Sequence, residues 1–269
     1  MTASPIRMPA GLDALGLLLD QVAQRQRQDF GQLDSEAKAD GSLITACDRW
    51  SDAALVEGLA QLYPGEGVLS EEGSQCVPGS DAFWVVDPLD GTTNFAAGIP
   101  YWAISLARFE RGVPVLAVLD VPPLRQRIVA IRGGGAWRKH NKLQPPAARN
   151  QVAGCASLCS RSIGVLQKLP NQRFPGKIRL LGVASLNLVS VGMGQTISAL
   201  EATPKIWDLA AAWLVLQELN CPVRWLVRDP AQLHAGEDLS QANFPVLAAR
   251  DQSTLATFKP WADALVSPA

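Results

Sequence analysis

An apolar run that ends in two aspartates is the feature that most constrains this chain. Residues 82–90 read AFWVVDPLD, and GTTNF follows directly. The apolar part is typical of a buried β-strand, so Asp87 and Asp90 would lie at its end, separated by a proline and a leucine. Carboxylates held this close repel each other, and each raises the pKa of the other, unless a cation joins them. The sequence therefore predicts a strand end that binds a positive partner.

The first half of the chain is predicted to be rich in strands. Leucine and valine recur at helical spacing within residues 11–30, which predicts an amphipathic helix there. A second helix is expected over residues 51–63, before Pro64 and Gly65, and the segment SEAKADGSLITACDRWSD ahead of it is predicted to be a polar loop. Strands are expected in GVLSEEG, AFWVVD, WAISLARF, VPVLAVLDV and, twice, in QRIVAIRGGGAWRK.

The second half alternates short apolar runs with helices, which is typical of an α/β arrangement. Helices are expected near residues 185–194 and 206–220, with a strand in TISALEAT between them. The Pro- and Ala-rich segment LQPPAARNQVAG is predicted to separate two domains. An α+β domain over residues 1–145 would carry most of the acidic cluster, and an α/β domain over 146–269 would carry Asp208.

Composition excludes several classes of function. Hydrophobic residues make up 48% and charged residues 18%, as in ordinary globular proteins, and a formal charge of −1 offers no basic field for nucleic acid. The early LGLLL run lies between Asp13 and Asp20 and lacks the flanks of a signal peptide, so no membrane role is expected. Five cysteines without a C-x-x-C spacing predict neither disulfides nor a zinc site, which favours a reduced, cytoplasmic setting.

Other acidic residues also lie at the ends of apolar runs. Glu71 and Glu72 follow GVLS, Asp48 follows LITAC, and Asp208 lies in KIWDLAAAW. Strand ends and helix starts are where α/β proteins place ligands. Taken singly, Asp208 could cap its helix and the two glutamates could form a solvated loop. Taken together, oxygen ligands without nearby Cys or His favour Mg²⁺ or Mn²⁺.

The element DPLDGTTNF, with SEEG upstream and WDLAAA downstream, resembles the inositol monophosphatase family of metal-dependent, lithium-sensitive sugar-phosphate phosphatases. The resemblance extends from KADGSLITACD to about Glu218. It implies a layered αβαβα sandwich of the sugar-phosphatase type, assembled as a homodimer, and a phosphoric monoester hydrolase. Inositol monophosphate is the first candidate substrate. Histidinol phosphate, fructose 1,6-bisphosphate and 3'-phosphoadenosine 5'-phosphate are alternatives, and a non-catalytic binding or regulatory protein is the alternative of another class.

The resemblance also implies a role for each matching residue. Two or three Mg²⁺ ions, or Mn²⁺, would be bound by Glu71, Asp87, the Leu89 carbonyl, Asp90 and Asp208. Thr92 and Asp48 would position and deprotonate the attacking water, and Glu71 would help through waters on a third ion. Positions expected to contact the substrate are Lys38, Gly182, Ala184, Glu201 and the backbone N–H groups of Gly91 and Thr92.

Some segments depart from the family pattern or lie outside it. QELNCP, residues 217–222, replaces the EAGG that family members commonly carry, which leaves the local backbone path open. This chain has SEEG where family members more often have GEES, and both glutamates are present in each. The Gly-rich RGGGAW is expected to be a turn between strands rather than a phosphate loop. His140 and His234 lie outside every motif, so no Ser-His-Asp triad is expected.

Overall fold

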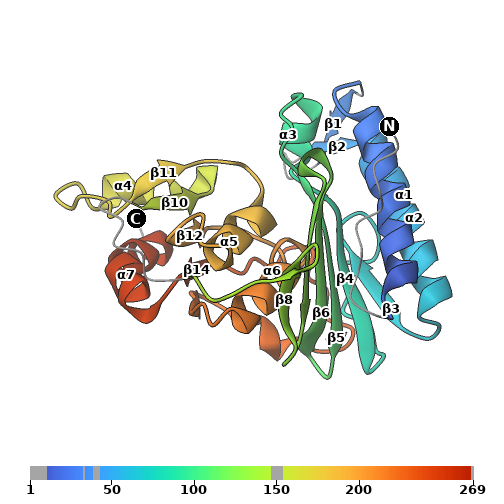
Figure 1. The fold of residues 1–269 in the computed structure, drawn as a ribbon. Helices are drawn as coiled ribbons and strands as arrows, with labels where there is room; N and C mark the ends of the chain where they lie inside the picture. The colour runs from blue at the N-terminus through green and yellow to red at the C-terminus, as the bar shows by residue number, and fades with distance from the viewer. Residues whose placement is uncertain (1–10, 33, 39–42, 147–153, 268–269) are drawn as a thin grey trace.

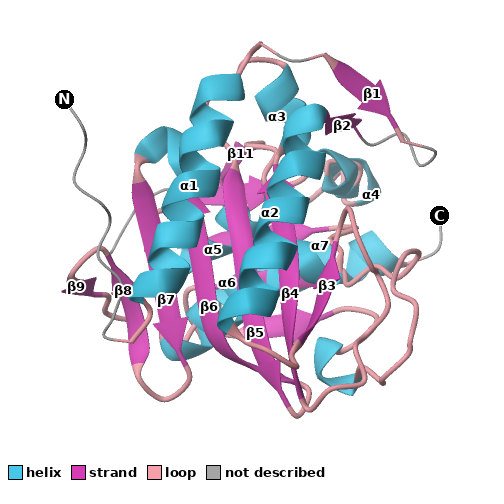
Figure 2. Cartoon of the chain, turned by 90° about the vertical axis from the view of Figure 1, so that its right-hand side faces the viewer, coloured by secondary structure: helices cyan, strands magenta, loops and turns pink. Residues whose placement is uncertain are grey.

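Helices and sheets alternate in five layers, as Figures 1 and 2 show. The structure, a computed structural model, describes residues 11–32, 34–38, 43–146 and 154–267. Among these residues, one sheet has seven strands and a second has five. Helices cover the outer face of each sheet, and two further helices lie between the sheets. No helix in the described ranges is long and apolar enough to cross a membrane.

The seven-stranded sheet confirms the strands predicted in the first half. Its order is β3-β4-β5-β6-β7-β8-β9. The strands are β3 (Gly67–Ser70), β4 (Ala82–Asp90), β5 (Ala103–Glu110), β6 (Val113–Val121), β7 (Gln126–Ile131), β8 (Gly135–Arg138) and β9 (Asn141–Lys142). β3 and β4 run parallel and the other pairs are antiparallel. Because parallel strands end at the same edge, the residues that follow β3 lie beside the end of β4.

Two helices cover the outer face of this sheet, α1 (Asp13–Asp29) and α2 (Ala46–Leu62). The leucines at helical spacing in both are buried against the sheet. α1 confirms the predicted helix, whereas α2 begins five residues earlier than predicted. A capping box sets that start: the Thr45 hydroxyl accepts from the backbone N–H of Asp48, and the Asp48 carboxylate accepts from the N–H of Thr45.

The prediction of a polar loop ahead of α2 is therefore wrong. The segment contains an antiparallel pair, β1 (Ser35–Ala37) with β2 (Leu43–Thr45), followed by the first turn of α2. The T-x-x-D spacing, and not the leucine periodicity, was the signal for the start of the helix. Residues 39–42, which connect β1 to β2, lie outside the described residues.

The middle layer consists of α5 (Ala184–Gly192) and α6 (Ile206–Glu218), each within two residues of its predicted bounds. α6 packs on the inner face of the first sheet, and α5 packs between α6 and the second sheet. After α6 the chain turns at Asn220, whose φ of 54° is left-handed. Asn tolerates that conformation, so QELNCP forms an ordinary helix C-terminus.

The Gly-rich segment RGGGAW is the turn between β7 and β8, as predicted. The Glu218 carboxylate at the end of α6 accepts hydrogen bonds of 2.8 Å from the N–H groups of Gly133 and Gly135. These backbone donors bind a side chain of the protein itself, so the turn has a structural role.

The second sheet and the last layer come from the second half of the chain. The sheet order is β11-β10-β12-β14-β13. Its strands are β10 (Cys155–Leu158), β11 (Lys177–Arg179), β12 (Ser198–Glu201), β13 (Val223–Trp225) and β14 (Val246–Ala249). α4 (Val165–Lys168) and α7 (Gln252–Val266) cover its outer face. The remaining short helices are α3 (Thr92–Ala96), η1 (Pro122–Leu124), η2 (Ser160–Ser162) and η3 (Pro230–Gln232).

The change from one sheet to the other falls between β9 and β10, where the domain boundary was predicted. Most of the Pro- and Ala-rich segment, residues 147–153, lies outside the described residues. The division into domains 1–145 and 146–269 stays a prediction. All five cysteines are free thiols, which agrees with the prediction of no disulfide.

Candidate active site

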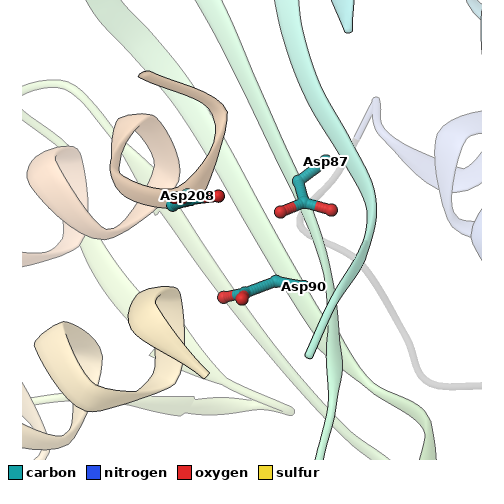
Figure 3. Close-up of side chains that lie close together, drawn as sticks. All are labelled: Asp87, Asp90 and Asp208. Atoms are coloured by element: carbon teal, nitrogen blue, oxygen red, sulfur yellow. The ribbon is translucent and has the colours of Figure 1, made fainter. Parts of the chain in front are cut away.

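Three aspartates converge between the two halves of the fold (Figure 3). Asp87 and Asp90 come from the end of β4, and Asp208 comes from the first turn of α6. Each offers a carboxylate oxygen, and these oxygens all lie within 4.8 Å of one another. The structure thus brings together residues that are separated by more than a hundred positions in the sequence.

An irregularity in β4 explains how both of its aspartates reach the same place. In a regular strand, residues three apart point to opposite faces of the sheet. Asp87 pairs with Ser105 on β5 and Asp90 pairs with Ala103, so β4 carries one extra residue between these pairs. This bulge between Asp87 and Asp90 turns the strand, and Figure 3 shows both carboxylates on the side of Asp208.

Backbone N–H groups orient each of the three carboxylates. Asp87 accepts from Leu89 at 2.9 Å, Asp90 from Ser185 at 2.7 Å, and Asp208 from Lys205 at 2.7 Å. Asp208 therefore does cap its helix, as the simpler interpretation held, and it also faces the other two aspartates.

Burial raises the pKa of each aspartate, and neighbouring carboxylates add to the shift of Asp87 and Asp208. Burial, together with the nearby Glu71, Asp90 and Asp208 carboxylates, raises the pKa of Asp87 well above its usual range. Burial raises the pKa of Asp90 to about 6, although hydrogen bonds from the start of α5 oppose the shift. Asp87 is 1% exposed, and its Oδ2 has no hydrogen-bond partner among the described residues. A buried carboxylate oxygen without a partner, beside two like charges, fits a divalent cation with oxygen ligands.

Glu71 follows β3 and lies beside this cluster. Its N–H donates to the carbonyl of Val86, one residue before Asp87. Lys38 lies 2.9 Å from the Glu71 carboxylate and also pairs with Glu72. Burial alone would lower the pKa of Lys38. The charges and hydrogen bonds of the two glutamates have the larger effect, so the pKa of Lys38 is raised. Burial and the Glu71 charge raise the pKa of Glu72 to about 7.

Thr92 and Asp48 form the predicted pair. The Thr92 hydroxyl donates to Asp48 Oδ1 at 2.7 Å, and the Leu89 carbonyl oxygen lies 3.1 Å from the same hydroxyl. The other Asp48 oxygen accepts from the N–H of Thr45, so the capping box fixes the carboxylate. A hydroxyl whose proton points to Asp48 presents its lone pairs outward and can accept from a water.

Gly91 directly precedes α3 and has a φ of 104°, a conformation that favours glycine. A Cβ at this position would lie 2.8 Å from Val183 Cγ2. The glycine therefore lets the chain approach Val183, which lies between Gly182 and the first residue of α5, Ala184.

A pocket of about 250 Å³ opens beside the aspartates. Asp90 and Asp208 line it, as do the predicted contact residues Gly182, Ala184 and Glu201. Glu201 is 2% exposed and ends β12, and its Oε1 accepts from the Asn187 side-chain amide at 2.8 Å. Burial raises the pKa of Glu201 to about 8.

Sequence reasoning missed several residues of this site. Ser185 and Asn187 on α5 hold Asp90 and Glu201, and Arg161 and Thr203 line the far wall of the pocket. The Ser185 contact is a backbone N–H, so its side chain gave no signal. Arg161 belongs to a short polar helix and lies outside the motifs, so only the fold brings it to the pocket.

Comparisons with known proteins agree on one family. The family model described as "Inositol monophosphatase family" matches residues 7–249. The histidinol-phosphatase of Mycobacterium tuberculosis is 33% identical over 215 residues, covering 75% of this chain and 82% of that protein. The putative Nus factor SuhB of Neisseria meningitidis serogroup B is 32% identical over 239 residues, covering 85% and 90%.

Solved structures share the fold. An IMPase of Thermotoga maritima superposes with a TM-score of 0.80 at 24% identity, covering 94% of this chain and 97% of that one. An IMPase/NADP phosphatase complexed with Mg²⁺ and phosphate gives a TM-score of 0.78 at 24% identity, covering 96% and 95%. These likenesses confirm the predicted layered α/β fold.

Proposed function

This chain belongs to the inositol monophosphatase family and is a hydrolase of phosphate monoesters, and we propose that it is a Mg²⁺-dependent phosphatase of small polyol phosphates. The convergence of Asp87, Asp90 and Asp208 around an unpartnered carboxylate oxygen, at the wall of a pocket, carries the proposal. Inositol monophosphate is the first candidate substrate. Histidinol phosphate, fructose 1,6-bisphosphate and 3'-phosphoadenosine 5'-phosphate remain the alternatives.

Two or three Mg²⁺ ions would be held by Glu71, Asp87, the Leu89 carbonyl, Asp90 and Asp208, with Mn²⁺ as a possible substitute. Carboxylate and carbonyl oxygens are the donors that Mg²⁺ prefers, and a related solved structure is described as complexed with Mg²⁺ and phosphate. When bound, Mg²⁺ would neutralise the phosphate, lower the pKa of an attacking water and stabilise the leaving oxygen.

The residues of the chain would act on the water and the phosphate. A water that donates to Thr92 Oγ1 would lose a proton to that hydroxyl as Thr92 passes its own proton to Asp48, because the hydroxyl already donates to Asp48. The N–H groups of Gly91 and Thr92 would bind phosphate oxygens. The positive charge of Lys38 would offset the negative charge of Glu71 and Glu72, with which it forms ion pairs.

The pocket would bind the rest of the ester. Gly182 and Ala184 would allow close approach of the substrate, and Glu201 would accept hydrogen bonds from its hydroxyl groups. Asn187 supports this role because its amide fixes one Glu201 oxygen at the edge of the pocket. The rival interpretation, a non-catalytic binding protein, is disfavoured because the carboxylates and the Thr92–Asp48 pair are all in place.

Assay of a panel of phosphate esters with Mg²⁺ tests this function. The panel contains the candidate esters and an aryl phosphate without ring hydroxyls. We expect hydrolysis of the aryl phosphate and higher kcat/KM for the polyol esters. Equal kcat/KM for the aryl phosphate and every polyol ester would contradict the proposed role of the pocket.

Two further expectations rest on family membership, and a third rests on the cysteine pattern. Li⁺ should inhibit hydrolysis at millimolar concentration when Mg²⁺ is low. An unchanged rate at saturating Li⁺ would show that this chain is not lithium-sensitive. The chain should form a homodimer, which light scattering after size-exclusion chromatography tests. It should reside in the cytoplasm, which fractionation of cells tests.

A further inference from the structure

Arg161 lies on the wall of the pocket that also contains Asp90 and Asp208. It belongs to η2, directly after β10, and its Nη1 donates to the hydroxyl of Thr203 at 2.8 Å. Thr203 follows β12 and lines the same pocket. The two residues are 42 positions apart in sequence, so this bond holds the guanidinium against the loop that follows β12.

Among the described residues, no carboxylate forms an ion pair with Arg161. In the part of the chain that the structure describes, its one side-chain partner is the neutral Thr203 hydroxyl. Glu201, the carboxylate on the same side of the pocket, accepts instead from Asn187. Among the described residues that line the pocket, Arg161 is the sole cationic side chain.

We propose that Arg161 binds a second anionic group of the substrate, at the pocket wall formed by η2 and Thr203. This inference rests on the proposed function and narrows its substrate class to small polyhydroxylated phosphate esters that carry a further carboxylate or phosphate. Guanidinium matches both groups because its planar N–H fork can bind two oxygens at once. The same charge disfavours an ester whose other end is an ammonium group.

A purely structural role for Arg161 makes a different prediction. If the bond to Thr203 only tethers η2 to the end of β12, then removal of the guanidinium should weaken all ligands equally. If Arg161 binds an anion, then its removal should weaken only the ligands that carry one. The discriminating quantity is therefore a ratio of affinities between two ligands that differ in a single group.

Two esters provide such a pair. Glucitol 6-phosphate and 6-phosphogluconate differ at C1, which is a hydroxymethyl group in the first and a carboxylate in the second. The KI of each is measured with Mg²⁺ by competition against hydrolysis of an aryl phosphate, so the result does not depend on their own turnover. Fructose 6-phosphate and fructose 1,6-bisphosphate form a second pair, in which the added anion is a phosphate.

In the wild type we expect the member with the added anion to bind about tenfold more tightly in at least one pair. Arg161→Gln should bring that ratio close to one. Arg161→Lys should give an intermediate ratio, because the charge is kept and the fork is lost. Arg132→Gln removes a cation from the turn after β7, outside the pocket lining, and should leave the ratio as in the wild type.

Equal ratios in the wild type and Arg161→Gln would overturn the proposal. If Arg161→Gln did not fold, the ratio in Arg161→Lys would decide, and a wild-type ratio there would overturn it as well. The carboxylate and phosphate pairs show which anion is bound. Failure of this inference is separable from failure of the proposed function, because only the latter abolishes Mg²⁺-dependent hydrolysis of the aryl phosphate.

Discussion

At one end of the pocket three aspartates converge, whereas at the other end Glu201 and Arg161 each have an uncharged partner. Burial and the neighbouring carboxylates raise the pKa of Asp87, and no described residue donates a hydrogen bond to its Oδ2. Glu201 is held by Asn187, and Arg161 is held by Thr203. The aspartate end therefore needs a cation to balance its charge, whereas both charged side chains at the other end already have a hydrogen-bond partner. Substitutions at the two ends should therefore differ in size and in dependence on the substrate.

The largest effect is expected from Asp87→Asn. This change removes a carboxylate shared by the whole cluster, and we expect kcat/KM to fall by at least about 10³-fold for every ester, a loss of roughly 4 kcal/mol in transition-state stabilisation. Asp81→Asn is the matched control, because Asp81 is exposed just before the same strand. Steady-state assays with Mg²⁺ measure both variants, and a mild defect in Asp87→Asn would mean that the metal site lies elsewhere.

Thr92→Ala should give the next largest effect. Loss of the hydroxyl that contacts Asp48 should lower kcat about 10²-fold, and equally for polyol and aryl phosphates, since all esters share the same reaction at phosphorus. Thr93→Ala is the control, because Thr93 is the exposed neighbour in the first turn of α3. A loss confined to polyol phosphates would place Thr92 among the substrate contacts instead.

Glu201→Gln tests the other end of the pocket and should have a smaller effect that depends on the substrate. The amide keeps an oxygen that can accept from Asn187, so the fold is preserved while the charge is removed. We expect kcat/KM for inositol 1-phosphate to fall about 10-fold, or roughly 1–2 kcal/mol, with a smaller change for an aryl phosphate. If both substrates lost activity equally, Glu201 would belong to the catalytic machinery.

The two ends also differ in how far the sequence predicted them. The element DPLDGTTNF is contiguous, so Asp87, Asp90 and Thr92 could be named together, and apolar runs on either side fixed the strand that carries them. The capping box of α2 was missed because leucine spacing marked only the middle of that helix. Arg161 and Asn187 were missed because their roles depend on how β10, β12 and α5 pack, and no local pattern records that packing.

The metal-free protein should also show a pH dependence of its stability. The folded-state pKa of Asp90 is about 6 and that of Glu201 about 8, both above the ordinary values for carboxyl groups. The folded state therefore binds protons more tightly than the unfolded state, and its extra stability, present below about pH 4, is lost as pH rises toward 8. Each group contributes at most about 1.4 kcal/mol per pH unit.

Urea unfolding in EDTA between pH 4 and pH 8 measures this slope. We expect the free energy of unfolding to fall with rising pH, and Asp90→Asn to reduce the fall. Saturating Mg²⁺ should stabilise most at the upper end of the range, because there the carboxylates are ionised. A metal-free protein that became more stable across this range would argue against the repulsive cluster.

Restoration of activity by Mg²⁺ tests the central claim most directly. The protein is stripped of metal with EDTA and dialysed, and aryl phosphate hydrolysis is followed as Mg²⁺ is added back, with Asp208→Asn measured in parallel. The account predicts no turnover without metal, a saturable rise with Mg²⁺ in the wild type and little or no rise in the variant. Full turnover by the wild type in excess EDTA would contradict it.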